Sequence, residues 1–140
     1  MPTDFVNIVF DEILEKLATI INGEFNIPVY YDEHKGNQSF LVTPESDELV
    51  TNVSSGMQRQ YNIIINYELK SGGKYTKNTI KQVSNVMERL KRLVYNEKIQ
   101  STGAEWFDAQ ITSVTYEIDE DDKTLIKGVA NFNCQNMEII

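Results

Sequence analysis

The stretch with the clearest chemical potential is YELKSGGKYTKNT, residues 67–79, where Gly-Gly-Lys separates an apolar run from a helical pattern. A phosphate-binding loop has the spacing Gly-x-x-x-x-Gly-Lys-Ser/Thr, because the first glycine lets the backbone wrap the phosphate and the hydroxyl reaches magnesium. With Gly73 and Lys74 in that frame, the first position holds Glu68 and the last holds Tyr75. A carboxylate there would repel phosphate, so the glycines indicate a tight turn between a strand and a helix.

Two other residues are candidates for catalysis. His34 is the sole histidine and follows two acids in YDEHKGN. A general base needs a nucleophile and an orienting partner, and no pattern here supplies them, so His34 is interpreted as a solvated turn residue. Cys134 alternates with apolar residues and is predicted to be a buried small side chain. A single cysteine cannot form an intrachain disulfide, which fits a reducing cytoplasm.

The densest acidic cluster, DEDDK at residues 119–123, is the candidate calcium site. An EF-hand loop needs a glycine at its sixth position and a glutamate at its twelfth. Counting from Asp119, those positions hold Thr124 and Ala130, so the loop pattern fails. The cluster is interpreted as a charged hairpin turn, with docking onto a basic surface as the alternative. The sequence thus predicts no metal, no other cofactor and no catalytic residue.

Charge is distributed unevenly along the chain, whose net charge is −8. Residues 1–58 carry −8, residues 59–104 carry +6 and residues 105–140 carry −6. An acidic chain is a poor default nucleic-acid binder, and the basic segment shows no RNA-binding motif or interleaved aromatics. The basic segment is instead predicted to form a solvated helix face or to meet an acidic surface on a neighbouring copy.

Hydrophobic periodicity predicts an α+β fold. The first helix is predicted to begin at Thr3, a good cap, and to end at Asn22-Gly23. The strongest strand signal is the alternation of apolar and polar residues over 58–69, while the polar stretch 45–57 is predicted to be a long exposed loop. The remaining predicted elements are strands at 29–31, 39–44, 106–118 and 125–134 and a helix at 75–94.

These elements, in the order α-β-β-β-α-β-β, predict a mainly antiparallel β-sheet with two α-helices packed on one face. The chain has the length of a single domain, residues 1–140, with 41% hydrophobic residues. Its start lacks a basic region followed by a long apolar stretch, which predicts no secretory signal. No apolar run approaches the roughly 20 residues of a membrane span, so no membrane association is expected.

The whole pattern resembles the tail terminator, or tail completion, proteins of long-tailed bacteriophages. The resemblance rests on DFVNIVFDEILEKLATIING, QYNIIINYEL, NTIKQVSNVMERLKRLV and the closing hairpin WFDAQITSVTYEIDEDDKTLIKGVANFNC. It covers nearly the whole chain and consists of element order, size and character, without a diagnostic short motif. Head-closure and other neck proteins are the close competitors, and a small ligand-binding module or an enzyme is the less favoured class.

The resemblance implies a structural, non-enzymatic virion protein of the tail and neck, assembled in the host cytoplasm. It implies a ring, usually of six copies, that caps the head-proximal end of the tail tube, stops tube growth and presents a surface to the neck protein. DNA would pass through the ring without specific binding. The expected contacts with a neighbouring copy or the tube are the basic helix, the acidic turn and the apolar tail: Lys77, Lys81, Arg89, Arg92, Asp119, Glu120, Asp121, Asp122, Met137, Ile139 and Ile140.

Overall fold

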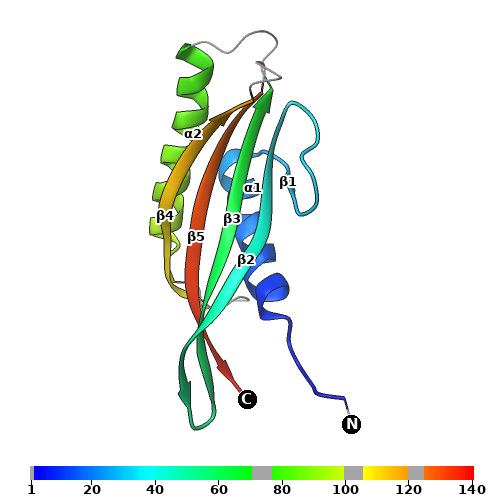
Figure 1. Cartoon of the computed structure of the whole chain (residues 1–140), viewed down its shortest axis with the longest axis vertical. Coiled ribbons are helices and arrows are strands. Elements are labelled where there is room, and N and C mark those ends of the chain that lie inside the picture. The colour runs from blue at the N-terminus through cyan, green and yellow to red at the C-terminus, as the bar shows by residue number, and fades with distance from the viewer. Residues whose placement is uncertain (1, 71–76, 100–105, 120–124) are drawn as a thin grey trace.

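The computed structural model describes residues 2–70, 77–99, 106–119 and 125–140. It confirms the α+β class and the predicted element order (Figure 1). The elements are η1 (Ile8–Leu14), α1 (Glu15–Phe25), β1 (Val29–Tyr30), β2 (Gln38–Val53), β3 (Gly56–Lys70), α2 (Lys77–Asn96), β4 (Phe107–Ile118) and β5 (Leu125–Ile139).

The strands form one five-stranded sheet in the order β1-β2-β3-β5-β4. Short β1 runs parallel to β2, and the other neighbouring strands are antiparallel. The helices lie behind the sheet in Figure 1, with α2 against β4 and β5 and the N-terminal helix near β1 and β2. Among the described residues, no helix covers the opposite face, which we call the open face of the sheet.

The core lies between the sheet and the helices. In β3, Ile63, Ile65 and Tyr67 are buried and face the helices, as the sequence alternation predicts. They pair in register with β5, where Ile63 lies opposite Phe132 and Ile65 opposite Ala130. The predicted alternation is therefore confirmed in β3 where the helices cover it.

The N-terminal helix begins later than predicted. Residues 2–7 have no regular structure, and the helix starts at Ile8 with a π-helical segment. The cap is Asn7 rather than Thr3, because the Asn7 side-chain oxygen accepts a hydrogen bond from the Phe10 amide at 3.2 Å. Asparagine and threonine are both good caps, so composition alone did not distinguish the two positions.

The same helix also ends later than predicted. It continues through Asn22 and Gly23 to Phe25, and Asn26 then takes the left-handed conformation with φ of 54°. Asn22 remains helical while its side chain donates a hydrogen bond of 3.1 Å to the carbonyl of Ile27. The structure thus uses the later of two asparagines as the helix stop.

The predicted loop at 45–57 is wrong. Strands β2 and β3 continue through it as a hairpin that projects beyond the helices (Figure 1), with Val53 paired to Gly56 near the tip. Both faces of β2 are exposed over residues 44–53, so no apolar alternation marks the strand in the sequence. Backbone pairing with β3, not burial of side chains, defines this segment.

The C-terminal residues also belong to the sheet. Strand β5 extends to Ile139 instead of ending at Cys134, and its last residues pair with the start of β3. A Cβ atom at Gly56 would overlap the Glu138 carbonyl, so the two backbones approach each other closely there. The apolar sequence MEII is therefore not a free tail.

Strand β4 contains two irregularities that change which side chains face the core. Its register with β5 shifts between Phe107 and Gln110 and again between Ile111 and Ser113. Asp108 has a φ of 52°, and the strand accordingly carries apolar residues at both odd and even positions.

Among the described residues, no helix is long and apolar enough to cross a bilayer.

Candidate subunit interface

The predicted basic surface lies on α2, but its residues differ in what they contact. Lys81 is exposed, and the side chain of Lys77 lies outside the described part of the chain. Arg89 donates to Glu24 at 3.0 Å and lies 4.7 Å from the ring centroid of Phe25. Arg89 therefore joins α2 to α1 within one chain, although about half of its side chain remains exposed.

The C-terminal half of α2 holds a small ion-pair group on its surface. Glu88 lies 2.6 Å from Lys91 and 3.7 Å from Arg92. The hydrogen bond from Lys91 holds the pKa of Glu88 below its usual value. Arg92 is the most exposed member and keeps its charge available to a partner.

Asp119, the first residue of the predicted acidic turn, lies at the other end of the sheet from the projecting hairpin. Asp119 follows the last residue of β4, and its amide donates to the carbonyl of Leu125 at 3.2 Å. Glu120, Asp121 and Asp122 fall outside the described residues. The structure therefore separates Asp119 from Met137, Ile139 and Ile140, which lie at the opposite end of the sheet.

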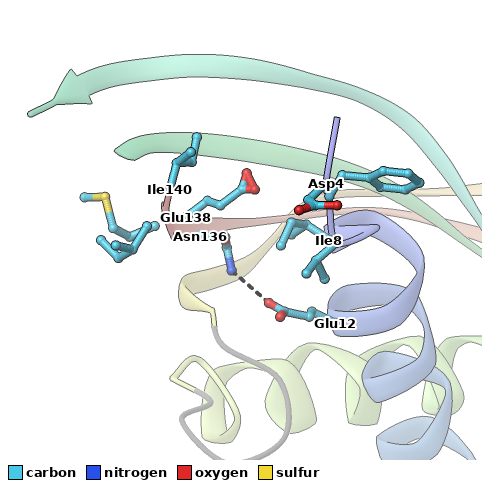
Figure 2. A pocket seen from close by; sticks show the side chains of 10 residues that line it. Asp4, Ile8, Glu12, Asn136, Glu138 and Ile140 are labelled. Carbon is cyan, nitrogen blue, oxygen red and sulfur yellow. Dashed lines mark hydrogen bonds between the residues drawn. The ribbon is translucent and has the colours of Figure 1, made fainter. Parts of the chain in front are cut away.

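The three apolar C-terminal residues line a cleft with the start of the chain (Figure 2). The cleft measures about 420 Å³ and has acidic as well as apolar walls. A hydrogen bond of 3.4 Å from the Asn136 amide to Glu12 links β5 to η1 beside it. We call it the terminal cleft; its lining is Asp4, Phe5, Val6, Ile8, Glu12, Asn136, Met137, Glu138, Ile139 and Ile140.

Of the ten lining residues, the sequence analysis named only Met137, Ile139 and Ile140. Phe5 and Val6 were assigned to the first helix, and Asp4 to its favourable first turn, although all three precede the helix. No periodic signal brings them next to Glu138, since the two ends of the chain meet only through the folded sheet. The one available signal in the sequence was the large apolar residue Phe5 beside the acid Asp4, and the structure leaves Phe5 exposed.

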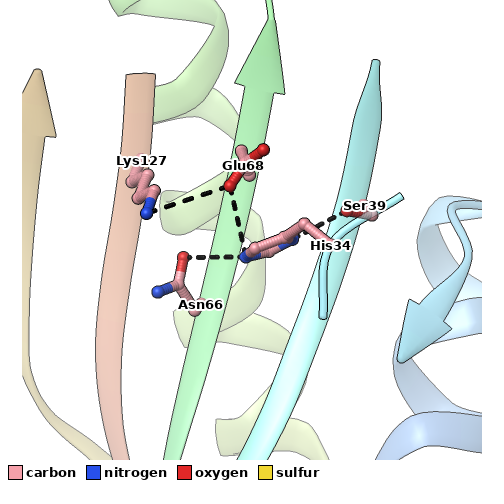
Figure 3. Close-up of polar contacts among 5 residues, drawn as sticks. All are labelled: His34, Ser39, Asn66, Glu68 and Lys127. Atoms are coloured by element: carbon pink, nitrogen blue, oxygen red, sulfur yellow. Dashed lines mark hydrogen bonds and ion pairs between the residues drawn. The ribbon is translucent and has the colours of Figure 1, made fainter. Parts of the chain in front are cut away.

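His34 is not a solvated turn residue, so that interpretation is wrong (Figure 3). Its ring lies against the open face of the sheet, with Nδ1 2.7 Å from the Ser39 hydroxyl and Nε2 3.3 Å from the Asn66 side-chain oxygen. Glu68 lies 3.7 Å from Nε2, and Lys127 lies 3.9 Å from the same carboxylate. These contacts fasten the segment between β1 and β2 to the sheet.

Ser39, His34 and Glu68 contact one another in a row, as the serine, histidine and carboxylate of a hydrolase triad do. Ser39, however, is only 1% exposed, so its hydroxyl is closed to a substrate. Burial lowers the pKa of His34, against the opposing effect of Glu68, and keeps the ring neutral. The group is therefore suited to holding a loop rather than to nucleophilic attack.

The remaining chemical candidate is Cys134. It is fully buried, as predicted, and burial raises the pKa of its thiol to about 12. A thiol of that kind is not a nucleophile at neutral pH. Across the described ranges, no group of three or more His, Cys, Asp or Glu side chains is placed to hold a metal ion.

Comparison with known proteins identifies a solved structure that has the same fold. No protein-family model and no curated protein matches the sequence. A solved structure shares the fold over its full length. It is a chain from the virion of a native gene transfer agent particle, with a TM-score of 0.65 and 8% sequence identity. The alignment covers 95% of this chain and 100% of that chain, which establishes a common fold.

Proposed function

We propose that this protein is a structural component of a phage-type virion. The observation that carries the proposal is the full-length fold match to a chain of a gene transfer agent virion. Ser39 and Cys134 are buried, so neither offers an accessible nucleophile, which favours an assembly role over catalysis. The expected location is the particle itself, assembled in the host cytoplasm.

Within that class, we propose a tail terminator. Six copies form a ring on the head-proximal end of the tail tube, stop the addition of tube subunits and join the tail to the neck protein. DNA passes through the ring without specific binding. The motivation is the order and character of the elements, which the structure retains along the described chain.

The placement of charge supports a ring. Exposed bases lie on α2, which flanks the β4 edge of the sheet, where β4 also carries the exposed acids Asp108 and Glu117. Further exposed acids lie on the opposite side, on residues 2–7, η1 and β2. A head-to-tail ring needs two different, complementary surfaces on each subunit. Opposite charge on opposite sides sets the orientation of such a contact and speeds association.

The test is assembly with the cognate tail tube protein. Light scattering behind size exclusion should give a ring mass, and electron micrographs should show the ring at one end of tubes of uniform length. Tubes made without the protein should overgrow. A chain that stays monomeric both alone and with tube protein would overturn the terminator function. Density in the neck, away from the tube end, would assign a head-closure role instead.

A further inference from the structure

The segment that joins β1 to β2, residues 31–36, is attached to the sheet in an unusual way, and we call it the strap. We propose that His34 is the one side chain that pins the strap to the open face of the sheet, and that protonation of His34 releases the strap while the core stays folded (Figure 3). The proposal concerns a conformational switch within one chain and does not depend on the ring.

Backbone hydrogen bonds fix the chain at both ends of the strap. Before it, the Pro28 carbonyl accepts from the Phe40 amide at 2.9 Å, where β1 runs beside β2. After it, the Asn37 carbonyl accepts from the Lys70 amide at 2.8 Å. Release of the strap therefore leaves both anchors and the sheet in place.

Between these anchors, His34 supplies the contacts with the sheet. Its side chain is 10% exposed, whereas the other residues of the strap are classed as exposed. Among the described residues, every hydrogen bond from the strap to the sheet comes from the His34 ring. Lys35 instead lies 5.2 Å from the ring centroid of Tyr30, and Tyr31 contacts Phe10 of η1. Loss of the His34 contacts thus leaves the strap without a hydrogen bond to the sheet.

The hydrogen bonds of His34 suit a neutral ring. Nε2 faces two oxygen acceptors, Asn66 Oδ1 at 3.3 Å and the Glu68 carboxylate at 3.7 Å, so we assign the hydrogen to Nε2. Nδ1 is then the acceptor for the Ser39 hydroxyl at 2.7 Å. A second proton on Nδ1 would turn that acceptor into a donor. Because Ser39 is 1% exposed, water is not at hand to replace the lost acceptor.

The charges around the ring do not remove this conflict. Glu68 favours a charged ring, but its carboxylate also lies 3.9 Å from the Lys127 ammonium, which opposes that charge. Lys127 stands opposite Glu117 of β4. The charged residues of the strap itself are exposed: Asp32, Glu33 and Lys35. Burial is the largest effect and lowers the pKa of His34, so a protonated ring is favoured in water.

The pH range of the switch follows from this difference. A histidine in water takes up its proton near pH 6.5, and the pinned ring does so only at a lower pH. Between those two values, the equilibrium constant for release rises by up to about tenfold for each unit of pH lost. The strap is held at neutral pH, and acid uncovers Ser39, Asn66 and Glu68 on the open face.

Limited proteolysis of the full-length chain tests the switch. Endoproteinase Glu-C cuts after glutamate in both weak acid and weak base, and Glu33 lies in the strap. Cleavage after Glu33 is measured at pH 7.5 and pH 5 by mass spectrometry and divided by the rate for a free peptide of residues 28–40. Since cleavage reports the open population, we expect the normalised rate to rise at least about fivefold at pH 5.

Three variants, each compared with a peptide carrying the same change, isolate the role of His34. His34→Gln cannot take up a proton, so its normalised rate should not depend on pH. His34→Ala lacks the pin and should be cut fast at both pH values. Lys35→Ala is the matched control, because Lys35 makes no hydrogen bond to the sheet, and it should behave as the wild type.

The fluorescence of Trp106, the sole tryptophan, reports on the core because its side chain is buried. Its emission should be the same at both pH values. An emission change that accompanies cleavage would show global unfolding and overturn a local release. Equal wild-type rates at the two pH values, slow cleavage of His34→Ala at pH 7.5, or wild-type pH dependence in His34→Gln would each overturn the switch.

Discussion

At the scale of single residues, the contact between β5 and α2 leaves no space for an added methyl group. A Cβ atom at Gly128 would lie 2.7 Å from Cγ and Sδ of Met87, which is fully buried. We expect Gly128→Ala to lower the free energy of unfolding by about 1–3 kcal/mol, because the core must shift to accept it. Urea unfolding would measure the change.

A second glycine provides the matched control. Gly23 lies inside α1, and a methyl group added there would have nothing within 4 Å, so Gly23→Ala meets open space. Alanine is the better helix former, and we expect a gain of roughly 0.5–1 kcal/mol. Equal effects of the two substitutions would show that the Met87 contact does not limit packing.

His34 makes stability depend on pH. Because burial lowers its pKa in the folded protein, the unfolded chain binds the proton more readily. The stabilisation is complete above the unfolded value of about 6.5 and is lost as pH falls from there through the lower folded pKa. Glu68 and Lys127 are the charged groups that face the ring.

The prediction is a fall in the urea midpoint between pH 7.5 and pH 5 that is smaller in His34→Gln than in the wild type. Glutamine cannot gain a proton, while it retains hydrogen-bonding capacity towards Ser39 and Asn66. An identical pH dependence in both proteins would contradict the role given to His34. Acid-sensitive groups that do not contact His34 contribute equally to both curves and cancel in the difference.

At the scale of elements, the projecting hairpin depends on a close approach between β3 and β5. Gly56→Ala would drive a methyl group into the Glu138 carbonyl, and backbone cannot move aside as a side chain can. We expect amide protection at the end of β5 and the start of β3 to fall by at least about tenfold, with the rest of the sheet unaffected. Hydrogen exchange measures this directly.

Ser55→Ala is the control for the hairpin. It changes the neighbouring side chain but keeps the Ser55 carbonyl that accepts from the Ile140 amide at 2.6 Å. Protection should stay near the wild-type level. Loss of protection throughout the sheet in Gly56→Ala would instead show that the hairpin and the core unfold together.

The elements that sequence predicts well are those with one buried face. Alternation marks β3 over Ile63 and Ile65 because helices cover one side of it. Beyond the helices, residues 44–53 of β2 are exposed to solvent on both faces of the strand, so the sequence shows no such alternation there. Thr3 and Asn7 are both capping residue types, and the start of the helix between them depends on which residues pack on the sheet.

At the scale of the whole molecule, charge reversal on α2 should impair the ring more than the fold. We expect Lys77→Glu, Lys81→Glu and Arg92→Glu together to abolish ring formation in light scattering. Exposed charges contribute at most about 1 kcal/mol each to stability, so the melting curve should change little. A variant that unfolds outright, or that assembles normally, would contradict a charge-matched contact.

The candidate interface was only partly readable from the sequence. Segregated charge predicted that α2 carries bases, and the described side chains of Lys81 and Arg92 are exposed there. The terminal cleft was not predictable, since Asp4 and Glu138 meet only after the sheet has formed. Arg89 showed a further limit, because sequence could not reveal its contact with Glu24 on another helix.

The burial of Cys134 has a practical consequence for labelling the protein at a chosen site. The chain contains one cysteine, and its thiol lies in the core with a pKa of about 12. Maleimide dyes or spin labels will therefore react selectively with a cysteine introduced at an exposed position such as Ile99 or Ile140. The natural background needs no prior cysteine removal, so a label can be placed in an otherwise unaltered chain, and energy transfer can test whether labelled copies associate.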